Sequence, residues 1–285
     1  MLSPLPPRVY DLIDAALTED QAFSDPTTEA LVPPEVRAEG IIRAKAQGVL
    51  AGIDVALAVF QRVDPSLDIQ GLLADGAVLS PGNDIARVQG SAGSILRAER
   101  TSLNFLQRMS GIASDTNRYV RAIEGSRSRI VDTRKTAPGH RYLDKYAVRM
   151  GGGYNHRYNL ADGILIKDNH IEALRSKEMG LQEVIELALS RASHTIKVEV
   201  EVESLEAAQV AAEAGAHIIM LDNMPPDMMK QAMDLIAGRA VVEASGGITL
   251  DTVREVADAG VDLISIGGLT HSVTALDISL DLEFI

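Results

Sequence analysis

The second half of the chain alternates short apolar runs with stretches of helical spacing. The apolar runs lie at 129–133, 163–167, 196–202, 217–222, 240–245 and 261–266. Helical stretches separate the last four runs, at 204–215, 225–237 and 249–259. Repeated strand–helix units make parallel strands, which restricts the fold to a doubly wound sheet or an α/β barrel.

Polar residues at the ends of these runs favour the barrel. They recur at the carboxyl end of successive strands, at Asp132 to Lys135, Lys167, Glu201, Asp222, Ser245 and Gly267. Barrel enzymes carry their chemistry at that end, and a complete barrel has eight strands in about 250 residues. Because only six strands are expected in about 140 residues, we predict an open, incomplete α/β barrel with parallel strands at 111–272.

The first part of the chain has a different pattern. Apolar spacing at 7–17 predicts an amphipathic helix, and short strand-like runs broken by glycines at 37–100 predict a small α+β unit. A helix at 98–123 would join the two parts. We therefore expect an N-terminal domain at 1–110, to which the tail at 273–285, another strand candidate, could return.

Composition limits the classes of function. Cysteine is absent from the 285 residues, which excludes disulfides and thiolate metal sites. A formal net charge of −13 and few aromatic residues argue against nucleic-acid binding. No window approaches the roughly 20 apolar residues of a membrane-spanning helix, so we expect a soluble, cytoplasmic protein that does not bind membranes.

Positive charge is concentrated in one part of this acidic chain. From Thr133 to Lys167 there are seven Lys and Arg residues against two acidic ones, which indicates a polyanionic ligand. Three of the seven, spaced four apart on an expected helix, are interpreted as a solvated face: Arg141, Lys145 and Arg149. The candidates for binding anions are Arg134, Lys135, His156, Arg157 and Lys167.

Lys167 differs from an ordinary surface lysine. It closes the apolar run GILI at 163–166, so its ammonium group should point into the barrel mouth. An ammonium group there needs an anionic partner.

Acidic residues on two neighbouring strands could supply that partner and more. Glu199, Glu201 and Glu203 alternate with valines, so all three face the same side of the sheet. We favour Glu201 as the functional residue, with Glu199 below it, because Glu203 could simply cap the next helix. Together with Asp222, Glu201 could bind hydroxyl groups or a hard cation such as Mg²⁺.

Two glycine-rich turns follow the last two strands. They read SGGI at 245–248 and IGGLTHS at 266–272, and the first should lead into a helix near Thr249. Glycines let backbone N–H groups approach a phosphate, and a helix N-terminus favours an anion. Two such turns in tandem favour a phosphate site.

A set of motifs in a fixed order makes the chain resemble the quinolinate phosphoribosyltransferases, the carboxylating nicotinate-nucleotide pyrophosphorylases. The resemblance runs from about residue 10 to the C-terminus. Its motifs are ERTSLNFLQRMSGIA (99–113), DTRKTAPG (132–139), GGGYNHR (151–157), LIKDNH (165–170), VEVEV (198–202), LDNM (221–224), SGGI (245–248) and GGLTHS (267–272).

The resemblance implies an N-terminal α/β sandwich, an open barrel and a homodimer with shared active sites. It implies transfer of phosphoribosyl from phosphoribosyl pyrophosphate to quinolinate with decarboxylation, giving nicotinate mononucleotide, pyrophosphate and CO2, and a requirement for Mg²⁺. This is a step of NAD biosynthesis.

The resemblance also implies residue roles. The quinolinate carboxylates and a nearby phosphate would be held by Arg134, His156, Arg157 and Lys167, with Arg100 reaching in from the other subunit. The catalytic residues would be Lys135 at the pyrophosphate, with Glu201 and Asp222 at the ribose hydroxyls or the metal. The 5-phosphate would be bound by Ser245, Gly246, Gly267 and His271.

The chain departs from the family at DPTT, residues 25–28, where the family usually reads GDITT. Three alternatives remain open from the residues. They are a paralogue on the same scaffold with a different acceptor, a phosphate-binding barrel isomerase or aldolase, and a non-enzymatic anion-binding module.

Overall fold

The computed structural model describes residues 5–174 and 179–285. The chain divides into two compact units. The first unit comprises residues 1–117, 137–152 and 272–285, and the second comprises residues 118–136 and 153–271. The predicted domain boundary at residues 110 and 111 lies inside one long helix, α4 (Ala92–Ala122).

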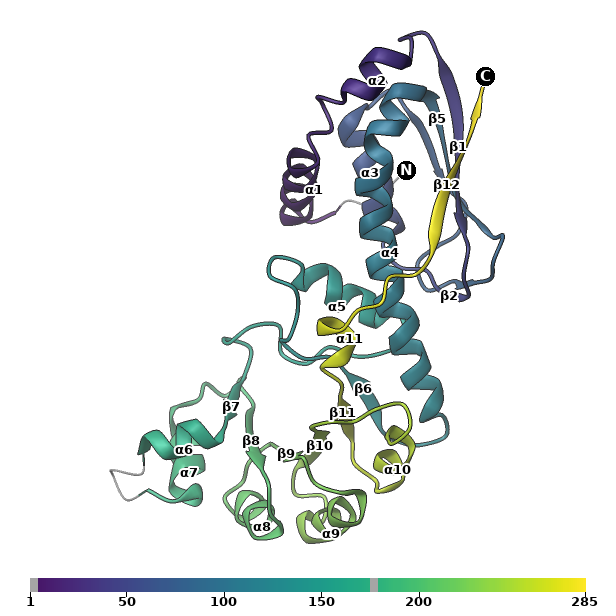
Figure 1. Cartoon of the computed structure of the whole chain (residues 1–285). Helices are drawn as coiled ribbons and strands as arrows, with labels where there is room; N and C mark the ends of the chain where they lie inside the picture. The colour runs from purple at the N-terminus through teal and green to yellow at the C-terminus, as the bar shows by residue number, and fades with distance from the viewer. Residues whose placement is uncertain (1–4, 175–178) are drawn as a thin grey trace. The chain divides into compact units, whose positions relative to one another are not determined.

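The first unit is built on a four-stranded antiparallel sheet in the order β12-β1-β5-β3, with a two-stranded ribbon of β2 and β4 beside it (Figure 1). Its strands are β1 (Arg37–Ala44), β2 (Gly48–Val49), β3 (Asp68–Gly71), β4 (Val78–Leu79), β5 (Asp84–Ser91) and β12 (Ile278–Phe284). Its helices are α1 (Pro7–Glu19), α2 (Pro26–Leu31), α3 (Ile53–Val63), α5 (Arg141–Met150) and the first 26 residues of α4, 92–117.

The sheet of the first unit has one buried face. Along β1, every second residue from Ala38 to Ala44 is buried, and the residues that alternate with them are more exposed, as expected for a strand with one face in the core. Helix α3 packs on β3 and β5. The C-terminal strand β12 pairs antiparallel with β1, with Phe284 opposite Ala38, so the chain ends in the sheet of its N-terminal part.

The segment before β12 crosses α4 at very close range. A Cβ atom added to Gly111 would lie 2.1 Å from the carbonyl oxygen of Thr274, so no larger residue fits there. The Gln107 side chain of the same helix donates to the Ile278 carbonyl at 2.7 Å. Small size at 111 and an amide at 107 therefore fix the path of the tail.

Helix α5 corrects one interpretation of the sequence. Lys145 is only 3% exposed, so it does not belong to a solvated face, although Arg149 is exposed and Arg141 is half-buried. The neighbouring Asp144 is fully buried and accepts from both Nε and Nη2 of Arg108, at 3.2 and 3.0 Å. Because α5 is enclosed on more than one side, a spacing of four residues was not enough to predict which face is exposed to solvent.

The second unit holds six parallel strands in the order β6-β11-β10-β9-β8-β7, with helices outside them (Figure 1). The strands are β6 (Arg129–Val131), β7 (Ile164–Ile166), β8 (Val198–Val202), β9 (Ile218–Asp222), β10 (Val241–Ser245) and β11 (Leu263–Ser265). The helices are α6 (Asp168–Leu174), α7 (Leu181–Arg191), α8 (Leu205–Glu213), α9 (Pro226–Ile236), α10 (Val253–Asp258) and α11 (Gly268–His271).

The sheet of the second unit stays open, because β6 and β7 are its two edges. A single parallel bridge joins Val131 to Tyr154 beside β6. The predicted fold class, an N-terminal α/β part followed by an open, incomplete barrel of parallel strands, is confirmed. Among the described helices none is long and apolar enough to cross a membrane.

Candidate active site

A cavity of about 780 Å³ lies at the carboxyl ends of the parallel strands. Of the residues that the sequence singled out as a site, all but Arg100 line it. They are Arg134, Lys135, His156, Arg157, Lys167, Glu201, Asp222, Ser245, Gly246, Gly267 and His271. Arg100 lies exposed on α4, in the first unit.

Strand register brings Lys167 and Glu201 together. Ile166 pairs with Val200, so the next residue of each strand, Lys167 and Glu201, lies at the same level. The ammonium group of Lys167 donates to Oε2 of Glu201. The Glu201 side chain is 15% exposed and that of Lys167 is 42% exposed. The anionic partner that Lys167 required is thus the glutamate of the neighbouring strand.

Asp222 ends the next strand of the sheet. It pairs in register with Ser245 and accepts from Nδ2 of Asn223 at 2.7 Å. Glu201 and Asp222 therefore place carboxylate oxygens on adjacent strands at the edge of one cavity. Such oxygens are the ligands that Mg²⁺ prefers.

Asp132 shapes the site without facing it. It is fully buried and accepts from Asn155 Nδ2 at 2.7 Å and from the backbone N–H of His156 at 2.8 Å. Its carboxylate therefore anchors the 151–157 segment to the end of β6. We conclude that Asp132 orients the cationic residues that follow in both segments.

Arg157 and Arg134 crowd positive charge on one side of the cavity. Arg157 donates to the Gly163 carbonyl at 2.9 Å, which fixes the guanidinium group. Burial, followed by the charge of Arg134, lowers the pKa of Arg157. An anion bound here would relieve the repulsion between the two guanidinium groups.

The Lys135 backbone is held by two threonines. Its N–H donates to Oγ1 of Thr133 at 3.0 Å, and its carbonyl accepts from Oγ1 of Thr270 at 2.8 Å. Its side chain is exposed at the cavity. Thr270 belongs to α11, so the turn that carries His271 and the turn that carries Lys135 are fastened together.

The first glycine turn has a steric reason for its glycine. Gly246 has a φ of 92°, and a Cβ atom there would lie 2.2 Å from Oδ1 of Asn223. The helix expected at 249–259 is present, but it begins later than predicted, because α10 starts at Val253. Residues between the glycines and the helix are turn and coil, so a helix N-terminus does not directly follow this turn.

The glutamates of β8 and the one that follows it differ in exposure. Glu199 is 4% exposed and lies deeper in the strand than Glu201, whereas Glu203 is exposed. The residue that caps α8 is Ser204 and not Glu203, because the Ser204 side chain accepts from the Ala207 N–H at 3.1 Å.

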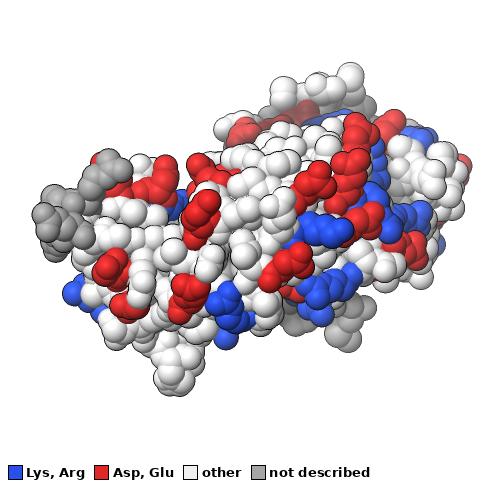
Figure 2. Space-filling model, turned by 90° about the horizontal axis from the view of Figure 1, so that it is seen from below, with Lys and Arg blue, Asp and Glu red and all other residues white. Residues whose placement is uncertain are grey.

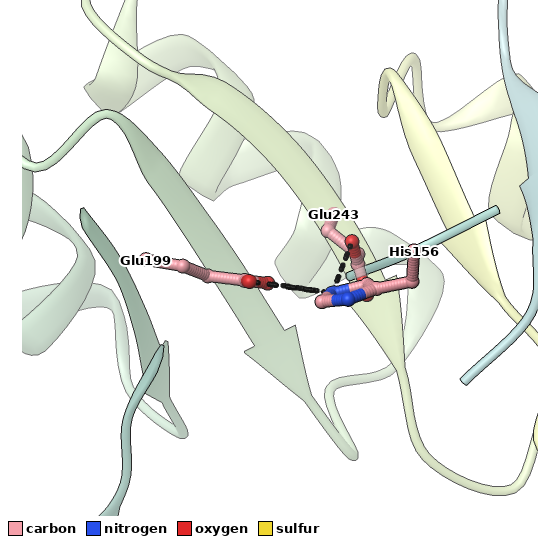
Figure 3. Close-up of side chains that lie close together, drawn as sticks. All are labelled: His156, Glu199 and Glu243. Atoms are coloured by element: carbon pink, nitrogen blue, oxygen red, sulfur yellow. Dashed lines mark hydrogen bonds and ion pairs between the residues drawn. The ribbon is translucent and has the colours of Figure 1, made fainter. Parts of the chain in front are cut away.

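A buried cluster below the cavity contains one residue that the sequence analysis missed, Glu243 on β10 (Figure 3). Nε2 of His156 lies 3.2 Å from an oxygen of Glu199 and 3.5 Å from an oxygen of Glu243. Burial, then the charge of Glu199, raises the pKa of Glu243 to about 7. A glutamate inside the apolar run AVVEAS was the available signal.

Geometry alone would allow this cluster to hold a metal ion, since one ligand atom of each residue lies within 4.8 Å of the others. The histidine argues against it. A metal-bound histidine normally donates its other ring N–H, but Nδ1 of His156 accepts the backbone N–H of Arg157 at 2.7 Å. Glu201 and Asp222 are therefore the better candidates for a cation.

A second hollow, of about 890 Å³, lies at the amino ends of the strands and includes Arg127, Lys197 and Arg239. Parallel α/β proteins bind ligands at the carboxyl ends of their strands, so we take the smaller cavity as the site.

On the face drawn in Figure 2, the coloured Lys and Arg side chains lie among Asp and Glu side chains, without a continuous basic surface.

Comparison with known families gives two matches that together cover most of the chain. The model of the quinolinate phosphoribosyl transferase N-terminal domain matches residues 25–110, and that of the C-terminal domain matches residues 112–281.

Individual relatives are similar over nearly the whole chain. A protein of Bacillus subtilis named a probable carboxylating nicotinate-nucleotide pyrophosphorylase is 43% identical, over 96% of this chain and 93% of its own. A chloroplastic carboxylating nicotinate-nucleotide pyrophosphorylase of Oryza sativa is 42% identical, over 96% of this chain and 78% of its own. The crystal structure of NadC from Streptococcus pyogenes is 44% identical, with a TM-score of 0.93 over 99% of each chain.

Proposed function

The chain belongs to the quinolinate phosphoribosyltransferase family, and we propose that it transfers the phosphoribosyl group of phosphoribosyl pyrophosphate to quinolinate with loss of CO2. The products are nicotinate mononucleotide, pyrophosphate and CO2. One observation carries the proposal: a single cavity is lined by cations from three segments and by carboxylates from two adjacent strands. The cations suit an acceptor with two carboxylates. The carboxylates suit a transition state in which positive charge develops on a phosphorylated ribose.

The acceptor side of the cavity is cationic. Arg134, His156, Arg157 and Lys167 would hold the two quinolinate carboxylates, since a guanidinium fork matches a carboxylate and a lysine supplies a point charge. Holding both carboxylates aims the pyridine nitrogen at the ribose. Positioning of this kind contributes much of the rate in a two-substrate reaction.

In the transfer step, the nitrogen lone pair forms a bond to the anomeric carbon while the bond from that carbon to pyrophosphate oxygen breaks. The ribose acquires positive charge, which the carboxylates of Glu201 and Asp222 would stabilise near its hydroxyls. Lys135 would stabilise the leaving pyrophosphate. The 5-phosphate would bind at Ser245, Gly246, Gly267 and His271, where the glycines allow a close approach.

In the decarboxylation step, the bond between ring carbon 2 and its carboxylate breaks, and the electron pair stays on that carbon beside the positive ring nitrogen. CO2 leaves, and the carbon takes a proton from water. The protein needs no nucleophile for either step.

Mg²⁺ is part of the proposal. The oxygen donors of Glu201 and Asp222 suit a hard cation, and these two residues would hold it together with the substrate. When bound, Mg²⁺ would supply neutralisation of the pyrophosphate charge.

We also propose a cytoplasmic homodimer in which Arg100 serves the cavity of the partner subunit. Arg100 is exposed and does not line the cavity of its own second unit. The motif at 99–113, which carries the resemblance, would then have a role between subunits.

The test is formation of nicotinate mononucleotide from quinolinate and phosphoribosyl pyrophosphate, with Mg²⁺ present or chelated. We expect product only with Mg²⁺. The Lys135→Ala variant should lose about a hundredfold in turnover, whereas Lys197→Ala, an exposed lysine outside the cavity, should keep it. Folded protein that binds phosphoribosyl pyrophosphate but makes no product from quinolinate would indicate a different acceptor.

A further inference from the structure

The floor of the cavity is a buried layer made by His156, Glu199 and Glu243 (Figure 3). His156 and Glu243 line the cavity above and also a smaller cavity of about 350 Å³ at the amino ends of the strands. Glu199 is 4% exposed and Glu243 is 1% exposed. The layer therefore separates the substrate cavity from the rest of the barrel interior.

The hydrogen bonds of His156 assign its tautomer. Nδ1 accepts the backbone N–H of Arg157 at 2.7 Å, so this nitrogen carries no proton. The ring proton must then lie on Nε2, which faces Glu199 at 3.2 Å and Glu243 at 3.5 Å. Nε2 of His156 thus places its N–H between two carboxyl groups.

One N–H cannot neutralise two buried carboxylates. Like charges this close disfavour double ionisation, and neither oxygen of Glu243 has a hydrogen-bond partner among the described residues. The groups that face Glu243 from the surrounding elements are Glu199 of β8, His156, Asp132 after β6 and the hydroxyl of Ser265 on β11. That hydroxyl donates instead to the Ala244 carbonyl, at 3.3 Å.

Apart from the imidazole of His156, these neighbours are acidic or neutral, and burial disfavours the charged form, so the deeper carboxyl group is the one that retains a proton. The pKa of Glu243, raised to about 7 by burial and by Glu199, agrees with that assignment.

We propose that Glu243 is a neutral acid and acts as a positioning residue for the acceptor. Together with Glu199 it keeps His156 oriented. Because it is uncharged, it adds no second negative charge to the floor of the cavity. This inference rests on the proposed function, because it supposes that the acceptor is a dianion bound over His156. Ionised Glu243 would repel such a ligand from below, and salt screens this repulsion much less at a buried site than at the surface.

The test measures binding of quinolinate by titration calorimetry at about pH 6 and about pH 8.5. Both ligand carboxylates are ionised throughout this range, so the ligand does not titrate. Wild-type protein should bind about tenfold more weakly at the higher pH, a loss of about 1.4 kcal/mol, because ionised Glu243 adds a negative charge beneath the ligand. The E243Q variant, a permanent mimic of the neutral acid, should match the wild type at low pH and change less than about twofold.

A matched control is Val242→Ala. Val242 is the fully buried neighbour of Glu243 on the same strand and faces the other side of the sheet. Its truncation weakens packing and should leave the pH dependence of binding as in the wild type. A merely structural role of Glu243 would make E243Q resemble this control.

Every possible result of this experiment either supports or overturns the proposal. An equal pH dependence in E243Q and wild type overturns the proposal, as does a large loss of affinity in E243Q at both pH values. If the wild type binds quinolinate with the expected pH dependence but forms no nicotinate mononucleotide, the proposed function fails while the role of Glu243 stands. No binding of quinolinate by the wild type overturns both.

Discussion

Glu201 is the residue for which a catalytic role and a structural role can be separated most directly. Its partner Lys167 is 42% exposed, so water can solvate the ammonium group when the carboxylate is removed. We expect Glu201→Gln to lower kcat/KM about a hundredfold and to change the free energy of unfolding by less than about 1 kcal/mol. Steady-state kinetics and urea unfolding give the two numbers.

Glu203→Gln is the matched control for Glu201, because Glu203 is exposed on the same segment and does not line the cavity. It should leave both numbers unchanged. Wild-type turnover in Glu201→Gln would remove Glu201 from the mechanism. A large loss of stability would mean that the ion pair holds the strand ends together.

Glu243 should make the stability of the protein depend on pH in a predictable direction. Its pKa is raised in the folded state from the ordinary value of 4.5 to about 7. The folded state therefore holds this proton more tightly than the unfolded chain does. The resulting stabilisation is complete below about pH 4.5 and is lost as the pH rises through about 7.

Replacing Glu243 by Gln removes that loss. We expect the Tm of Glu243→Gln, relative to the wild type, to rise between about pH 5 and about pH 8 and then to level off. Thermal unfolding followed by circular dichroism across this range measures the difference. A constant difference in Tm would show that Glu243 does not titrate in the window.

Individual residues show what the sequence could predict about the site and what depended on tertiary contacts. Lys167 ends an apolar run, and that pattern was enough to predict a charged partner. Glu243 lies inside such a run, where β10 was expected, and its meaning depends on His156 from a distant segment. Lys145 was misplaced because helical spacing describes one helix and not what packs around it.

At the scale of elements, the turn after β10 allows a comparison of two adjacent glycines. Gly246 and Gly247 both have positive φ, but only at Gly246 would a Cβ atom meet a neighbour, Asn223. Gly247→Ala should cost about 1 kcal/mol through backbone strain. Gly246→Ala adds a steric clash and should cost about 2 to 3 kcal/mol.

The same two variants test the role of this turn in binding. Gly246→Ala must displace the turn or Asn223, so the KM for phosphoribosyl pyrophosphate should rise by more than in Gly247→Ala. Chemical denaturation and initial-rate kinetics measure the two effects. Equal behaviour of the two variants would mean that the turn adapts and that close approach at Gly246 is not needed.

The strands of the second unit could be predicted to within two residues at each end. Buried parallel strands are continuous apolar runs, and their bounds are visible without tertiary information. Helix α3 was missed for a related reason: from Ile53 to Phe60 nearly every residue is buried, so no helical period shows and the segment resembles a strand. Helix α7 was also missed. It buries only Val184 and Ile185, which are too few apolar residues to define an amphipathic helix face.

At the scale of the whole molecule, the proposed homodimer makes a claim about which subunit supplies Arg100. Every other predicted site residue lines the cavity of the second unit, so loss of Arg100 and loss of Lys135 should affect different subunits. Arg100→Ala and Lys135→Ala should each lose about a hundredfold in turnover when expressed alone. Arg121→Ala, an exposed arginine on the same helix α4, should remain active.

Co-expression of the two variants then distinguishes sharing from independence. In a mixed dimer, the subunit carrying Arg100→Ala keeps its own Lys135 and receives Arg100 from its partner, so one of two sites is complete. Random pairing makes half of the dimers mixed, which predicts about a quarter of wild-type activity. If Arg100 served its own subunit, each site would lack one residue and no activity would return. Selecting mixed dimers by two different affinity tags should raise the value to about a half, and its failure to rise would contradict the shared site.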